Sequence, residues 1–156
     1  MDKIILAISS ALGFGYFPVA SGTAGSIPGV MIAYAFWKLA GAGSLGSPAY
    51  LALIAILLAV GIWVSGRAEV IYGKKDCGKI VIDEVVGMMI TLAFLPASWF
   101  NFAVGFFLFR LFDVLKPYPA NWINDHMGGG KGVMLDDVAA GIYANIGLVL
   151  INRLHC

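Results

Sequence analysis

The charged residues of this chain are confined to short stretches, and the stretches between them are long and apolar. Apart from three charges before residue 40 and one at Arg153, every charge lies in two segments, 67–84 and 110–137. A spanning helix needs about 20 predominantly apolar residues, and the charge-free runs are long enough to supply several such helices. The pattern therefore predicts a helical protein embedded in a membrane.

The composition agrees with this prediction. Hydrophobic residues make up 60% of the 156 residues and charged residues only 12%, whereas a soluble domain has about 25% charged residues. The length suits a single domain over residues 1–156. The net charge of +1 is a near-cancellation of ten bases and nine acids, which excludes a nucleic-acid-binding surface or an acidic tail.

We expect an all-α, polytopic bundle with about five membrane-embedded helices. Pro28 marks the start of the first, and residues 3–17 form an interfacial or partly buried helix rather than a secretory signal. The apolar run 85–109 fits one tilted span, but Pro96 favours two shorter helices in a hairpin. The predicted segments are 28–45, 49–66, 85–96, 98–112 and 138–152.

Five crossings place three polar segments on the same face of the membrane. These are Ser21–Ser26 and the two charged segments, 67–84 and 110–137. They carry most of the lysines, so the positive-inside tendency predicts that this face is cytoplasmic. A single span over 85–109 would instead put the two charged segments on opposite faces.

The first candidate site residues are Asp83 and Glu84, at the start of an apolar helix. On a helix these carboxylates share a face with Gly87, which lets a partner helix approach closely. Acids entering a membrane helix are costly and are usually paired, metal-bound or functional. The alternative is that they cap the helix N-terminus and have no further role.

A second group follows at three-residue intervals. Arg110, Asp113 and Lys116 lie on one side of a helix that Pro117 ends. Alternatively, Arg110 pairs with Asp113 and the basic side chains extend toward the lipid headgroups.

The third group lies in GGGKGVMLDD, residues 128–137. Its glycines, Gly129 among them, allow a loop whose N–H groups face an anion, with Lys131 as a point charge and Asp136 and Asp137 opening the last helix. The loop lacks the Ser or Thr that follows the lysine in nucleotide-binding phosphate loops. A flexible linker with capping aspartates is the alternative.

Together these groups supply ligands for a hard cation and a phosphate. Oxygen ligands favour Mg²⁺, which binds carboxylates together with substrate phosphate. Thr23 and Ser26 add hydroxyl groups near a helix N-terminus on the same predicted face. The candidate metal ligands are Asp83, Glu84, Asp113, Asp136 and Asp137, and the candidate phosphate-binding bases are Arg110, Lys116 and Lys131.

The segments SGTAGS, IVIDEVVGM, FRLFDVLKPYP and GGGKGVMLDDVAAG, in this order, resemble the phosphatidylglycerophosphatase A family from about Gly13 to Asn145. The resemblance implies Mg²⁺-dependent hydrolysis of phosphatidylglycerophosphate to phosphatidylglycerol and inorganic phosphate at the cytoplasmic face of a bacterial inner membrane. It implies catalytic roles among Asp83, Glu84, Asp113 and Asp137. It does not distinguish the metal ligands from the general base, and it assigns no role to Cys77 or Lys79.

The sequence lacks the residues that other phosphatase mechanisms require. Cys77 has no following Arg to close a cysteine-phosphatase loop, and no paired Asp-x-Asp supplies an aspartyl nucleophile. Metal-assisted attack by water remains. Two alternatives from other classes are a small ion transporter or channel, which needs acids within the spans or on both faces, and a structural scaffold without metal dependence.

The predicted topology separates the two cysteines. Cys77 lies on the cytoplasmic face and Cys156 on the opposite face, too far apart for a disulfide, whose Cα atoms lie within about 7 Å. An impermeant thiol reagent applied to intact cells should label Cys156 much faster than Cys77. Equal labelling of the two cysteines would contradict five crossings.

Overall fold

The computed structural model describes residues 2–41, 45–75 and 77–155, and every regular element in these ranges is helical. The all-α prediction is therefore confirmed. In chain order the elements are α1 (Asp2–Ser9), the 3₁₀ helix η1 (Phe14–Tyr16), α2 (Ser21–Ala40), α3 (Pro48–Tyr72), α4 (Ile82–Thr91), α5 (Trp99–Leu115), α6 (Ala120–His126) and α7 (Gly129–His155).

Local sequence signals explain several helix ends. The Ser47 side chain accepts a hydrogen bond from the Tyr50 N–H, and Pro48 occupies the first turn of α3. The Ser98 side chain caps α5 in the same way. Gly73 ends α3 in the left-handed conformation that glycine adopts at low cost.

The apolar run 85–109 forms a hairpin, as predicted. Helix α4 ends at Thr91 and α5 begins at Trp99. The Asn145 side chain of α7 donates hydrogen bonds to the carbonyls of Thr91 and Ala93, at 2.9 and 2.8 Å. It thereby satisfies carbonyls that the end of α4 leaves without helical partners.

Two predicted helix starts are wrong. Helix α2 begins at Ser21, so Pro28 lies in its interior, and α7 begins at Gly129 rather than Val138. Glycine and proline usually interrupt helices, but here tertiary packing outweighs that tendency. A Cβ at Gly130 would lie 1.8 Å from the carbonyl oxygen of Ile62, so this glycine lets the first turn of α7 pack directly on α3.

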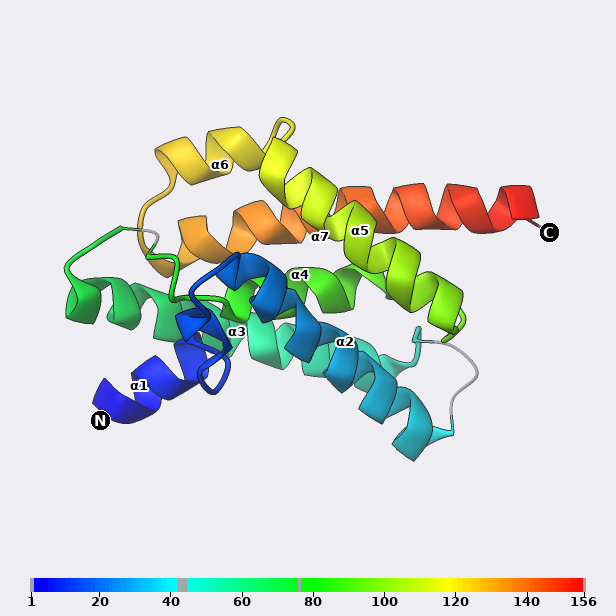
Figure 1. Ribbon diagram of the computed structural model, residues 1–156, viewed down its shortest axis with the longest axis horizontal. Helices are drawn as coiled ribbons and strands as arrows, with labels where there is room; N and C mark the ends of the chain where they lie inside the picture. The colour runs from blue at the N-terminus through cyan, green and yellow to red at the C-terminus, as the bar shows by residue number, and fades with distance from the viewer. Residues whose placement is uncertain (1, 42–44, 76, 156) are drawn as a thin grey trace.

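Helix α4 lies at the centre of the molecule. Helices α3 and α7 run along the long axis on either side of α4, while α2 and α5 cross obliquely in front of it (Figure 1). Val85, Val86, Met88 and Met89 of α4 are at most 1% exposed. The residues that begin α4 are therefore held from several directions.

The three polar segments lie toward one end of the bundle (Figure 1), and their placement on one face of a membrane stays a prediction. Near this end Lys75 donates a hydrogen bond to the Asn124 carbonyl, which links the two charged segments. Elsewhere the Leu45 N–H donates to the Leu95 carbonyl at 3.1 Å, which joins the segment before α3 to the segment between α4 and α5. Cys77 is a free thiol, and Cys156 lies outside the described residues.

Two of the described helices are long and apolar enough to cross a membrane. They are Pro48–Tyr72 and the stretch Gly129–Leu154 of α7. Helix α4, with ten residues, rises about 15 Å, half of a hydrocarbon core of roughly 30 Å. Two membrane-length helices are consistent with a membrane protein, and the count of five crossings stays a prediction.

Helices α4 and α7 cross in direct backbone contact. A Cβ at Gly141 would lie 2.5 Å from the Gly87 carbonyl oxygen, and a Cβ at Gly87 would lie 2.9 Å from the Asp137 carbonyl oxygen. The Thr91 hydroxyl donates to the Gly87 carbonyl at 2.9 Å. This crossing confirms the predicted role of Gly87 in close helix approach.

Gly141→Ala should destabilise the protein, because the added methyl group overlaps the Gly87 carbonyl and forces the helices apart. The expected loss is about 1–3 kcal/mol, the usual range for overpacking. Gly147→Ala in the same helix is the control, since its Cβ would meet nothing nearer than Leu108 at 3.6 Å. Thermal unfolding in detergent should show a lower melting temperature for Gly141→Ala alone; equal melting temperatures would contradict the close crossing.

Candidate active site

Three carboxylates from two helices meet beside this crossing. Asp83 and Glu84 belong to the first turn of α4, and Asp137 lies in α7. One oxygen of each lies within 4.8 Å of the other two. Asp83 is 7% exposed and Asp137 3%, and Glu84 is half-buried. Negative groups this close and this buried repel one another unless a cation lies among them.

The donor set of this cluster fits a hard divalent cation. Glu84 Oε2 and Asp137 Oδ2 are buried and have no hydrogen-bond partner within the described residues. Buried acceptors without partners are costly, and a bound cation would satisfy them. Carboxylate oxygens are the ligands that Mg²⁺ prefers, so the residues fit the predicted ion.

Arg110 brings positive charge to the edge of the cluster. Its Nη1 forms an ion pair with Asp113 Oδ2 one turn along α5, as the alternative interpretation anticipated. The Arg110 side chain is only 19% exposed, however. Its guanidinium and the Glu84 carboxylate both lie beside Gly22, at the start of α2. Arg110 and Asp113 therefore belong to the site rather than to a solvent-facing pair.

Gly22 completes the site, although the sequence did not single it out. A Cβ at this position would lie 2.7 Å from Glu84 Oε1 and 2.9 Å from Arg110 Nη1. The first helical backbone bond of α2 runs from the Ala24 N–H to the Ala20 carbonyl, so the earlier N–H groups have no partner within the helix. A helix N-terminus of this kind favours an anion. The sequence feature that could have indicated Gly22 is its position between Ser21 and Thr23 at the start of a helix.

Asp136 is held in place by neighbours. Its Oδ2 accepts a hydrogen bond from Lys116 Nζ at 2.6 Å, and its Oδ1 accepts the Asp137 N–H at 3.0 Å. Asp136 is not among the three carboxylates that converge. The structure therefore gives Lys116 and Asp136 a position next to the cluster, where they support Asp137.

The predicted glycine-rich phosphate loop is wrong. Gly129–Gly132 form the first turn of α7, since the packing of Gly130 on α3 keeps them helical. Lys131 is exposed, and it precedes Asp137 by six residues, a rise of about 9 Å along the helix. Gly129 has a φ of +69° at the helix start. A direct substrate contact of Lys131 or Gly129 stays a prediction without support from this geometry.

The two predicted hydroxyl residues face other groups. The Ser26 hydroxyl is fully buried and donates to the Gly22 carbonyl at 2.9 Å. Thr23 lines a small pocket with Phe14 and Ile27. Their substrate-binding roles stay predictions, and Gly22 is the member of this motif that the structure places against the acidic cluster.

Fold and site together define a helical protein of membrane type, with a buried carboxylate cluster suited to a hard cation and an arginine beside it. The family model for phosphatidylglycerophosphatase A matches residues 7–152, and the chain belongs to that family. It is therefore an enzyme, a phosphoric monoester hydrolase. The family that the sequence motifs resemble is thus confirmed.

Three named relatives match over most of the chain. A phosphatidylglycerophosphatase A of Haemophilus influenzae is 36% identical over 140 residues, covering 89% of this chain and 83% of the relative. The Escherichia coli protein of the same name is 34% identical, covering 86% and 76%. A Bacteroides thetaiotaomicron protein named "Putative phosphatidylinositol-3-phosphatase" is 36% identical, covering 89% and 87%. No solved structure matches the chain.

Gly22→Ala should impair turnover without unfolding the protein, because the methyl group displaces Glu84 and the Arg110 guanidinium. Displacements of about 1 Å in an active site can lower rates up to roughly a hundredfold. Gly78→Ala is the matched control, since its Cβ would meet nothing nearer than Ser21 Oγ at 3.6 Å. Phosphate release and melting temperature are measured for both variants. Wild-type turnover in Gly22→Ala would remove Gly22 from the site.

Proposed function

We propose that this chain hydrolyses phosphatidylglycerophosphate to phosphatidylglycerol and inorganic phosphate, with Mg²⁺ as cofactor. The observation that carries the proposal is the buried cluster of Asp83, Glu84 and Asp137 beside Arg110. The names of the Haemophilus influenzae and Escherichia coli relatives support the substrate. The orphaned oxygens of Glu84 and Asp137 support the metal.

Asp83, Glu84 and Asp137 hold the cation in this proposal. When bound, Mg²⁺ polarises the phosphoryl group and makes water a better nucleophile at neutral pH. The cluster carboxylates also provide a place for the proton that the attacking water loses. The water oxygen bonds to phosphorus, the bond from phosphorus to the glycerol oxygen breaks, and that oxygen takes up a proton.

Arg110 and the start of α2 bind the phosphate. The guanidinium, which lies next to Gly22, offers a planar pair of donors to two phosphoryl oxygens, and the first-turn N–H groups of α2 add donors at a helix N-terminus. Asp113 orients Arg110 through their ion pair. Lys116 orients Asp136, whose Oδ1 is bonded to the Asp137 N–H. This chain thus stabilises the charge that develops on the transferred phosphoryl group.

The proposed location is the cytoplasmic face of a bacterial inner membrane, with several crossings of the chain. The site lies toward the end of the bundle that carries the loop after α3 and helix α6 (Figure 1). Lys74, Lys75, Lys79, Lys116 and Lys131 lie in the segments around this end, which supports a cytoplasmic orientation. The alternative of an ion transporter has no support from the site or from the relatives.

Asp137→Asn should lower phosphate release from phosphatidylglycerophosphate by at least about a hundredfold, because the amide removes a ligand charge from the cluster. Shape and melting temperature should be retained, since Asn is nearly isosteric.

The metal and the substrate are tested on the wild type. Purified wild type is assayed with Mg²⁺, with a chelator, and with phosphatidylinositol 3-phosphate as an alternative substrate. Turnover that does not depend on Mg²⁺ would contradict the proposed cofactor, and a preference for the inositol lipid would contradict the proposed substrate.

A further inference from the structure

An apolar groove runs between α2 and α5, the two helices that also carry Gly22 and Arg110. Its volume is about 300 Å³. The residues that the argument uses are Ile27 and Met31 of α2 and Trp99, Phe102, Ala103 and Phe107 of α5. Phe107 precedes Arg110 by three residues, so the two side chains share a face of α5. Phe107 therefore marks the end of the groove that lies nearer to Arg110 along α5.

The groove is open along its length. Phe107 is 72% exposed and Met31 58%, and Ala103 is also exposed. No polar side chain lines it. A concave surface with this lining suits a hydrocarbon chain, which makes no hydrogen bonds and loses nothing on leaving water.

A cluster of aromatic rings lies at the Trp99 end of the groove, the end farthest from Arg110 along α5. Trp99 stacks on Tyr34 with ring centroids 5.6 Å apart, and Phe102 meets both rings edge-on at 6.1 Å. Lys38 lies over the adjoining Trp37 ring, 4.6 Å from its centroid. The groove thus has a defined length.

We propose that this groove binds one acyl chain of the lipid substrate and that the Trp99–Tyr34 pair limits the chain length it accommodates. The proposal rests on the proposed function, because it takes the lipid phosphate to lie at Arg110. From Phe107 to Trp99 the helix rises about 12 Å, which is the extended length of roughly ten methylene groups. An acyl chain of that order fills the groove while its headgroup reaches the carboxylates.

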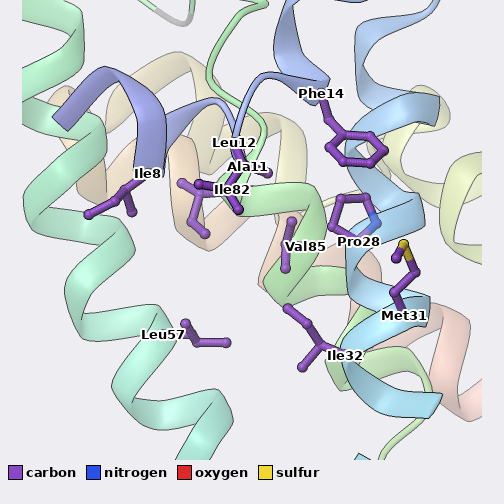
Figure 2. Close-up of a pocket in the computed structure, with 10 residues that line it drawn as sticks. All are labelled: Ile8, Ala11, Leu12, Phe14, Pro28, Met31, Ile32, Leu57, Ile82 and Val85. Atoms are coloured by element: carbon purple, nitrogen blue, oxygen red, sulfur yellow. The ribbon is translucent and has the colours of Figure 1, made fainter. Parts of the chain in front are cut away.

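A second apolar cavity lies between α2, α3 and α4 and shares Met31 of α2 with the groove. Its volume is about 330 Å³, and Figure 2 shows Phe14 beside Pro28, with Leu57 and Val85 on neighbouring walls. Helix α5, which carries Arg110, contributes no residue to this cavity. We therefore assign the acyl chain to the α2–α5 groove, whose wall and phosphate-binding arginine belong to one helix.

Ala103→Phe fills the groove and is the test variant. Ala55→Phe, on the exposed face of α3, is the matched control for adding an aromatic ring to a lipid-facing helix. Each protein is assayed in detergent with long-chain and short-chain phosphatidylglycerophosphate and with acyl-free glycerophosphoglycerophosphate. In Ala103→Phe we expect KM for the long-chain lipid to rise at least about tenfold while kcat stays the same. KM and kcat for the acyl-free substrate should equal those of the wild type. Trp99→Ala should shift the preference toward longer chains.

Binding is measured separately from turnover. A phosphonate analogue of the long-chain lipid should raise the melting temperature of wild type and Ala55→Phe more than that of Ala103→Phe, while an acyl-free analogue should act equally on all three. Equal shifts with both analogues, or equal KM changes in Ala103→Phe and Ala55→Phe, would overturn the groove assignment. A wild type that binds the long-chain analogue through the groove but releases no phosphate would overturn the proposed function and leave the groove in place.

Discussion

The contact between α4 and α7 at Gly87 and Gly141 is the constraint on which the rest of the structure depends. Without side chains at these positions the two backbones touch, and the turn that carries Asp83 and Glu84 comes within reach of Asp137. The Asn145 side chain of α7 donates to the Thr91 carbonyl, and the Thr91 hydroxyl lies 3.4 Å from the Gly141 carbonyl, so hydrogen bonds to backbone carbonyls hold the short helix α4 against α7. A bulkier crossing would separate the carboxylates and weaken any shared cation site.

Helix α2 contributes to function in two places. At its start Gly22 leaves room for Glu84 and the Arg110 guanidinium, and the N–H groups before Ala24 have no partner within the helix. Further along, the outer surface of α2 and the facing side of α5 enclose the apolar groove. One helix therefore borders both the polar site and the proposed acyl-chain site, as an enzyme acting on a lipid phosphate requires. The phosphate and the hydrocarbon need opposite environments a short distance apart.

Two ion pairs reduce the repulsion among the carboxylates of the site. Arg110 pairs with Asp113, and Lys116 with Asp136, so the outer acids are neutralised by bases from α5 and the residue that follows it. The inner acids are not neutralised in this way, since Glu84 Oε2 and Asp137 Oδ2 have no partner within the described residues. The acids at the edge of the site are thus paired with bases, whereas the carboxylates at its centre have unpaired oxygens that a cation would satisfy.

The sequence by itself determined the helical class, the hairpin around Pro96 and the carboxylates of the site, because apolar run length, charge position and turn residues are local properties. It also predicted that the polar segments share one end. The tertiary structure alone decided that Gly129–Gly132 are helical, that Gly22 adjoins the cluster, and that Lys131 and Ser26 face elsewhere. The physical reason is that a glycine favours a loop by its own flexibility but permits close helix packing when a partner backbone is present, and no local pattern reveals that partner.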